Sequence, residues 1–187
     1  LTEGNSRSAT MLAVETAKAN GSIISFDPNI RMFLWQDEDM LRKMLHYGLS
    51  NCTVLKMSKD EAIYQSGICD PEAAMESILK NYPNISVAFL TLGEKGSMVF
   101  SGESKAYVDA MSQKNVVDTT GAGDAFYGVC LYYIAKCSIS DLTMDKLAFI
   151  AERANAAGSI VTGRYGSMRV MPENIEIEET VRIQRKS

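Results

Sequence analysis

The sequence predicts an α/β fold whose sheet is mainly parallel. In the first half of the chain, short apolar runs typical of buried strands alternate with longer segments of helical pattern, as in successive βαβ units. Two glycine-containing turns follow and separate strand-like segments, which indicates antiparallel strands at the edge of the sheet. A turn of small residues then leads directly into an apolar helix. We therefore expect a single α/β domain over residues 1–187.

Local signals justify the first elements in order. Helix, strand, helix and strand are expected at 6–19, 22–26, 37–49 and 53–57. Ser6 is the expected N-cap of the first helix, and Asn20-Gly21 ends it. The isoleucine-rich strand is expected to be buried, and Asp27-Pro28-Asn29 breaks it.

Two helices in the middle of the chain have recognisable starts. Ser58 and Glu61 have the spacing of a capping box and open a helix toward Gln65. Asp70-Pro71 reads as an N-cap followed by proline at the first helical position, with the helix ending near Tyr82.

The second half is expected to form a hairpin followed by helices. Strands are predicted at 86–92, 97–100 and 105–109, and helices at 123–136 and 144–161. The tail from Pro172 onward is short and has room for one helix.

Composition excludes several classes of protein. The 187 residues are 46% hydrophobic and 22% charged, which is ordinary for a globular protein, and no run has transmembrane length. With 19 basic and 23 acidic residues, the net charge of −4 argues against a nucleic-acid partner. The four cysteines form no Cys-x-x-Cys pair, so free thiols in a reducing cytosol are expected rather than a zinc site. We expect a cytoplasmic protein without a membrane partner.

The most informative segment is Asp-Thr-Thr-Gly-Ala-Gly-Asp-Ala-Phe at residues 118–126. The backbone N–H groups of Gly121, Ala122 and Gly123 could face one point, and the first turn of a helix favours an anion there. Asp124 could cap this helix, which is the usual role of such an aspartate. Beside a bound anion it would instead be a base for an attacking hydroxyl. The local chemistry therefore indicates phosphoryl transfer to an alcohol.

This nine-residue string resembles the signature of the ribokinase-like (PfkB) family of carbohydrate kinases. The resemblance implies that Gly121, Ala122 and Gly123 form an anion hole and that Asp124 is the catalytic base. It also implies a three-layer α/β/α fold with a mainly parallel sheet. The resemblance covers only the C-terminal, nucleotide-binding part of that fold, so we expect the N-terminal strands, the β-lid and much of the sugar pocket to be missing from this chain.

A second motif follows the first predicted strand. Asp27-Pro28-Asn29-Ile30-Arg31 has the residues of a turn. It also resembles a segment of fructokinase-like and 2-keto-3-deoxygluconate kinase-like members of the family. That resemblance implies that Asn29 and Arg31 contact substrate together with Asp124, and the planar fork of Arg31 suits phosphate or carboxylate.

Metal positions are implied by two further motifs. Ser58-x-x-Glu61 stands where the family has Asn-x-x-Glu, which would make Glu61 an indirect ligand of Mg²⁺, although a capping box alone also explains the pair. Asp118 and Thr120 match positions that hold a monovalent cation such as K⁺ in some relatives.

The family resemblance also implies that residues 91–96 and 155–158 belong to a nucleotide site. A β-turn would equally explain the glycines of the first segment, and close packing would explain the small residues of the second. The matching residues are Thr91, Leu92, Gly93, Glu94, Lys95, Gly96, Gly123, Asn155 and Gly158.

The resemblance implies an ATP-dependent sugar kinase with ATP and Mg²⁺ as cofactors, most similar to fructokinases. The alternatives are a 2-keto-3-deoxygluconate kinase, another sugar or nucleoside kinase of the family, and a non-catalytic nucleotide-binding homologue. The expected partners are the sugar, ATP and a second copy in a homodimer. A dinucleotide-binding oxidoreductase would need Gly-x-Gly-x-x-Gly after the first strand, where Asp27-Pro28-Asn29 stands instead.

Overall fold

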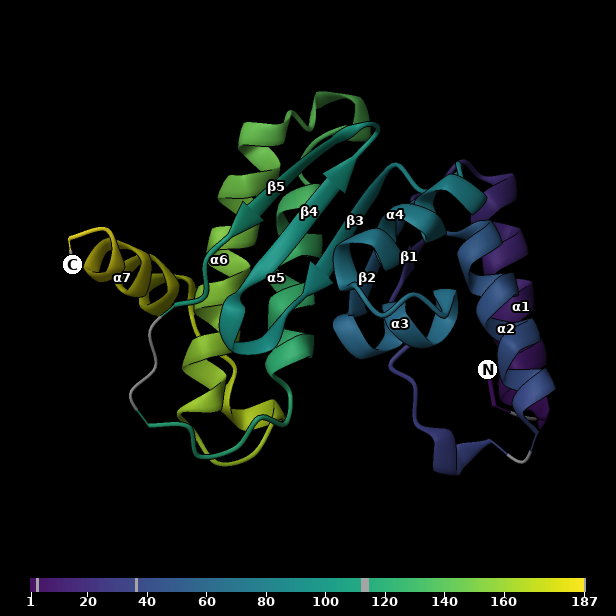
Figure 1. The fold of residues 1–187 in the computed structure, drawn as a ribbon, viewed down its shortest axis with the longest axis horizontal. Coiled ribbons are helices and arrows are strands. Elements are labelled where there is room, and N and C mark those ends of the chain that lie inside the picture. The colour runs from purple at the N-terminus through teal and green to yellow at the C-terminus, as the bar shows by residue number, and fades with distance from the viewer. Residues whose placement is uncertain (3, 36, 112–114, 187) are drawn as a thin grey trace. The chain divides into compact units, whose positions relative to one another are not determined.

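The computed structural model describes residues 1–2, 4–35, 37–111 and 115–186. The chain divides into two compact units, Leu1–Leu90 (unit 1) and Thr91–Ser187 (unit 2). Figure 1 follows the chain from its N-terminus to its C-terminus. Unit 1 contains α1 (Gly4–Ala19), β1 (Ser25–Phe26), a 3₁₀ turn (Met32–Leu34), α2 (Glu38–Asn51), β2 (Val54–Ser58), α3 (Lys59–Ser66), α4 (Pro71–Asn81) and β3 (Val87–Thr91), whose last residue belongs to unit 2. Unit 2 contains a 3₁₀ turn (Gly93–Lys95), β4 (Ser97–Ser101), β5 (Ser104–Val108), α5 (Ala122–Ile134), a 3₁₀ turn (Ile139–Asp141), α6 (Met144–Thr162), a 3₁₀ turn (Met168–Val170) and α7 (Asn174–Gln184).

The strands of unit 1 are ordered β1-β2-β3. β1 runs parallel to β2, with Ser25 opposite Val54 and Phe26 opposite Leu55. Helix α2 lies close to β1, because a Cβ atom on Gly48 would stand 2.4 Å from the Phe26 ring. Glycine at position 48 is therefore what lets the Phe26 ring reach the helix backbone. Both β2 and β3 are buried over their first four residues, as expected of strands covered on both faces.

The capping signals of α3 and α4 are confirmed. The Oγ of Ser58 accepts the N–H of Glu61 at 3.3 Å, and the Glu61 carboxylate accepts the N–H of Ser58 at 2.8 Å. Asp70 accepts the N–H of Ala73 at 2.8 Å, and proline occupies the first turn of α4. These contacts satisfy amide groups that a helix start leaves without partners.

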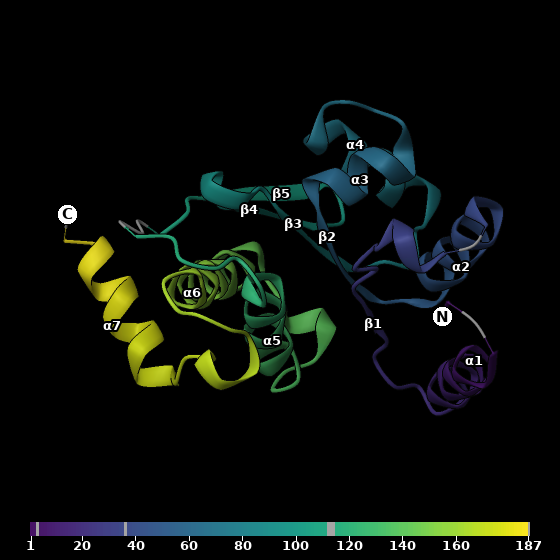
Figure 2. The ribbon, with the colours of Figure 1, turned by 90° about the horizontal axis from the view of Figure 1, so that it is seen from below.

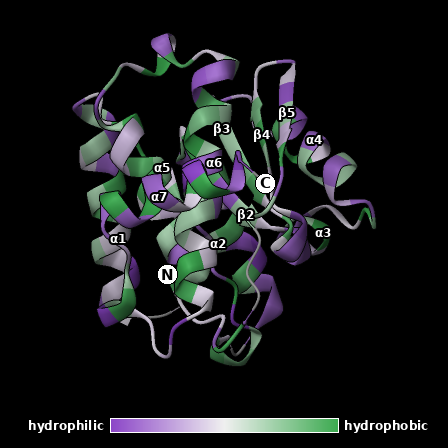
Figure 3. Cartoon of the chain, turned by 90° about the vertical axis from the view of Figure 1, so that its left-hand side faces the viewer, coloured by the Kyte–Doolittle hydropathy of each residue, from purple (hydrophilic) through white to green (hydrophobic). Residues whose placement is uncertain are grey.

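Two predictions at the N-terminal end are wrong. The strand expected at 22–26 is reduced to Ser25–Phe26, and Ile23 is 45% exposed rather than buried. Ser6 lies inside α1, which begins at Gly4, and is not its N-cap. No residue of α1 is buried, and Figure 3 shows both hydrophilic and hydrophobic residues along it. An apolar run predicts burial only where a neighbouring element covers it.

Unit 2 is built on an antiparallel hairpin. Ser97 of β4 pairs with Val108 of β5, and the ladder ends at Ser101 and Ser104. Helices α5 and α6 pack against each other on one side of this hairpin, with α6 against both strands (Figure 2). Helix α7 packs on α6 and adds Ile177 to a core of small and apolar residues. This hairpin and helix pair place the glycine-rich turn at the start of α5.

Within the parts of the chain that the structure describes, no helix combines the length and apolarity needed to cross a membrane.

Candidate active site

The glycine-rich turn forms the start of α5. Gly121 is the N-cap residue and has a left-handed backbone with φ +82°, which favours glycine. Its carbonyl accepts the N–H of Ala125 at 2.8 Å, so the helix is already formed at this point. The N–H of Ala122 donates to the carbonyl of Thr119 at 3.3 Å, which leaves Gly121 and Gly123 as the better placed donors for an anion. A 13-residue helix thus begins with backbone donors at a turn of small residues.

Asp124 stands in the first turn of α5 and is exposed. Gly121 is the N-cap of α5, so Asp124, three residues further on, does not hold the N-cap position that an aspartate at a helix start often takes. Among the described residues, the Asp124 carboxylate has no hydrogen-bond or ion-pair partner. Its oxygens are therefore open to a substrate hydroxyl.

Asp118 ties the turn to a neighbouring loop. One carboxylate oxygen accepts the N–H of Thr120 at 2.9 Å, and the other accepts the N–H of Gly166 at 3.3 Å. These backbone donors, that of Thr120 first, hold the pKa of Asp118 below its ordinary value. Both oxygens thus have protein partners, and a monovalent cation at Asp118 and Thr120 stays a prediction.

Two glycines allow close packing around the turn. A Cβ atom on Gly121 would lie 3.0 Å from the Cβ of Ser167, and one on Gly158 would lie 3.3 Å from the carbonyl oxygen of Ala122. Gly158 therefore lets α6 approach the turn, which is a structural reason for its presence beside the predicted nucleotide role.

The predicted nucleotide residues meet at the end of β5. Asn155 is 9% exposed, and its side-chain Nδ2 donates to the carbonyls of Val108 at 3.1 Å and Asp109 at 3.0 Å. Gly96 has φ +102°, and a Cβ atom there would lie only 2.2 Å from the Val108 oxygen. The structure thus brings Asn155 and Gly96 to the same stretch of backbone, but it leaves only Oδ1 of Asn155 for a ligand.

The remaining predicted nucleotide residues lie at the start of unit 2. Gly93, Glu94 and Lys95 form an exposed 3₁₀ turn, and Leu92 closes it by donating its N–H to the carbonyl of Gly96 at 2.8 Å. Thr91 precedes them as the last residue of β3.

Unit 1 contains Asn29 and Arg31, two of the three predicted substrate residues. Asn29 and Arg31 line a cavity of ≈ 240 Å³ together with Asp27 and Trp35. Among the described residues, Asn29 is the only non-glycine residue with positive φ, at 43°. Glu61, from the start of α3, accepts the N–H of Ile30 at 2.8 Å.

Sequence reasoning missed Lys56. This lysine lies in β2, and its Nζ pairs with the Asp27 carboxylate at 3.0 and 3.2 Å. Burial raises the pKa of Asp27 despite the opposing effect of Lys56. A lysine inside an otherwise apolar strand was the available signal, because a buried lysine usually has an acidic partner.

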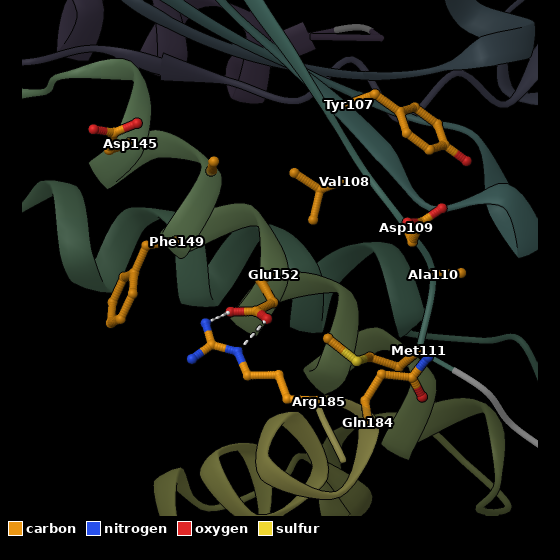
Figure 4. Close-up of a pocket in the computed structure, with 11 residues that line it drawn as sticks. Tyr107, Val108, Asp109, Ala110, Met111, Asp145, Phe149, Glu152, Gln184 and Arg185 are labelled. Carbon is orange, nitrogen blue, oxygen red and sulfur yellow. Dashed lines mark hydrogen bonds and ion pairs between the residues drawn. The ribbon is translucent and has the colours of Figure 1, made fainter. Parts of the chain in front are cut away.

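A larger cavity of ≈ 520 Å³ lies in unit 2 along β5, α6 and α7, and none of the predicted site residues lines it (Figure 4). Its wall includes Glu152 and Arg185, which pair at 2.9 and 2.6 Å. Among the described residues, no group of three or more His, Cys, Asp or Glu side chains could hold a metal ion.

Comparison with known proteins identifies the family. The model of the pfkB family of carbohydrate kinases matches residues 1–174. The chain belongs to this family. Fructokinase-2 of Oryza sativa subsp. japonica is 34% identical over 176 residues, which are 94% of this chain and 52% of the rice protein. Probable fructokinase-7 of Arabidopsis thaliana is 33% identical over 186 residues, which are 96% of this chain and 52% of the plant protein.

The pfkB fold is confirmed by a solved relative. The crystal structure of fructokinase from Vibrio cholerae O395, in its fructose-, ADP- and calcium-bound form, matches with a TM-score of 0.88 at 27% identity. The match covers 97% of this chain and 57% of the bacterial one. The predicted ribokinase-like α/β fold is therefore correct, and the chain spans about half the length of the pfkB relatives that it matches.

Proposed function

We propose that the protein acts as an ATP-dependent sugar kinase of the fructokinase type, with Asp124 as the catalytic base. The observation that carries this proposal is the start of α5, where a glycine turn presents backbone donors and the Asp124 carboxylate is not used as a cap. Membership of the pfkB family and the plant fructokinase relatives support the same reaction.

The reaction follows from the roles of these groups. Asp124 accepts the proton of a sugar hydroxymethyl as its oxygen attacks the γ-phosphorus of ATP, and the bond from that phosphorus to the bridging oxygen of ADP breaks. The N–H groups of Gly121 and Gly123 stabilise charge on the transferred phosphoryl oxygens. A base in this position contributes about 10²–10⁴-fold in rate.

Magnesium, when bound, neutralises charge on the ATP phosphates. Glu61 fits such an ion only through a bridging water, because one oxygen accepts the N–H of Ile30 and the other accepts the N–H and Oγ–H of Ser58. Solved relatives of the chain contain ADP with calcium or potassium, or ATP with Mg²⁺. We propose ATP and Mg²⁺ as the cofactors here, with K⁺ at Asp118 and Thr120 as a further prediction.

Fructose is the proposed acceptor because the similar proteins named above are fructokinases. The test is a coupled assay of ADP release from the product of the full reading frame, against a panel that includes fructose, 2-keto-3-deoxygluconate, ribose and nucleosides. We expect the highest kcat/KM with fructose. ATP binding without sugar-stimulated ADP release would instead support a non-catalytic homologue.

Two further predictions belong to the whole protein. A cytoplasmic location is supported by the four cysteines, which are all free thiols. Self-association into a homodimer is tested by light scattering of the same full-length product.

A further inference from the structure

The segment from Asp27 to Arg31 is held at two points. At one end the Asp27 carboxylate meets the Lys56 ammonium at 3.0 and 3.2 Å. At the other end the N–H of Ile30 donates to Glu61 at 2.8 Å. Both anchors belong to β2 or to the helix that directly follows it. The segment is therefore fixed to one rigid part of unit 1.

Between the anchors, Asn29 has a left-handed backbone with φ 43°. A side-chain-bearing residue keeps this conformation only where its surroundings determine it. The two anchors supply that determination, and they place Asn29 and Arg31 on the wall of one cavity.

The ion pair itself is withdrawn from solvent. The side chain of Lys56 is 8% exposed and that of Asp27 is 17% exposed. The Lys56 ammonium is not among the groups that line the cavity, whereas Asp27 is. Lys56 therefore acts on the cavity through Asp27 rather than by touching a ligand.

The Asp27–Lys56 ion pair also affects the charge on the wall of the cavity. Asp27 and Arg31 line the same cavity, and an aspartate without a partner would attract the guanidinium. Because Lys56 already neutralises Asp27, the described residues offer Arg31 only a contact with the carbonyl of Ile30 at 3.1 Å. Arg31 thus keeps donors for a substrate.

We propose that Lys56 is a positioning residue of the sugar site, which fixes the Asp27–Arg31 segment and keeps Arg31 unpaired for the incoming sugar. This inference rests on the proposed kinase function, and it names a residue that touches neither the sugar nor the reacting phosphate.

The test compares Lys56→Met with Lys43→Met in the product of the full reading frame. Lys43 is an exposed residue of α2 and serves as the matched control. In Lys56→Met we expect the KM for the sugar to rise about 10-fold or more, while the KM for ATP stays within about 2-fold. The reason is that the substitution releases the Asp27–Arg31 segment, which lines the proposed sugar cavity, and leaves the proposed nucleotide residues unchanged. Lys56→Arg keeps the charge and should restore most of the sugar affinity. A sugar KM equal to that of the control, or an increase confined to ATP, would overturn the proposal.

A second measurement separates this proposal from the function on which it rests. Hydrogen exchange of the Ile30 amide reports whether the segment is anchored, with or without turnover. We expect faster exchange in Lys56→Met than in Lys43→Met, and unchanged exchange would refute the anchoring. A wild-type protein that phosphorylates no sugar would contradict the proposed function, while the exchange data would still decide whether Lys56 anchors the segment. If Lys56→Met does not fold, Asp27→Asn removes the same ion pair with the lysine kept, and the same two results are expected.

Discussion

At the scale of single residues, position 121 is the one where the backbone most clearly requires glycine. Its φ of +82° disfavours any side chain, and a Cβ atom would stand 3.0 Å from that of Ser167. We predict that Gly121→Ala lowers the free energy of unfolding by about 1–3 kcal/mol and reduces kcat, because the turn must shift. Urea unfolding and steady-state kinetics measure both effects.

The matched control is Gly128→Ala in the same helix. Gly128 lies in the interior of α5, and a Cβ atom added there would meet no heavy atom within 4 Å. Alanine there should raise the free energy of unfolding by about 0.5–1 kcal/mol. Equal effects of the two substitutions would show that the turn does not need glycine.

Asp118 predicts a specific dependence of stability on pH. Backbone donors hold its pKa below the ordinary 3.8 of an aspartate in the unfolded chain. A lowered pKa in the folded state contributes stability that is present above 3.8 and is lost as pH falls through the folded-state pKa. The difference in unfolding free energy between wild type and Asp118→Asn should therefore be constant well above pH 3.8 and should shrink as pH falls through and below 3.8. A difference that does not vary with pH would rule out this linkage.

At the scale of elements, α7 is joined to α6 by Arg153. The Arg153 side chain is 7% exposed, and its guanidinium makes two hydrogen bonds to Glu178 of α7, at 2.7 and 2.8 Å. Because Glu178 is half exposed, we predict a loss of about 2 kcal/mol in unfolding free energy for Arg153→Met, which is typical of hydrogen bonds between charged groups. Arg182→Met, at an exposed position of α7, should change stability by less than about 0.5 kcal/mol. Similar losses in both variants would show that the contact with Glu178 is unimportant.

Elements with strong local signals were predictable from the sequence. The capping box of α3 and the Asp70-Pro71 start of α4 are contacts within a few residues, and both are confirmed. The strand at 22–26 was overestimated, because its burial depends on elements that the pattern does not reveal.

The features of the candidate site likewise divide into those that local sequence signals predict and those that depend on long-range contacts. The glycine turn is local, and the helix that it opens was predicted at 123–136 and is found at Ala122–Ile134. The use of the Ala122 N–H within the turn, by the carbonyl of Thr119, was not predicted. The contacts Asp27–Lys56 and Ile30–Glu61 join residues 29 and 31 positions apart, and no local pattern encodes such pairings. That is why Lys56 was missed and why Glu61 was predicted as a metal position without its contact to Ile30.

At the scale of the whole molecule, the two units carry candidate residues with different proposed roles. Unit 1 carries Asn29 and Arg31, the predicted sugar contacts, whereas unit 2 carries the turn at Gly121 and the proposed base Asp124. Substitutions in the first group should therefore change the KM for the sugar, and those in the second group should change kcat.

The central claim is that the carboxylate at position 124 removes the proton of the attacking hydroxyl. Asp124→Asn keeps the size of the side chain and removes its basicity. In the product of the full reading frame, we predict that kcat falls by at least about 10²-fold, while the affinity for ATP measured by calorimetry stays within about 2-fold of wild type. Turnover at the wild-type rate in this variant, with ATP bound normally, would contradict the account.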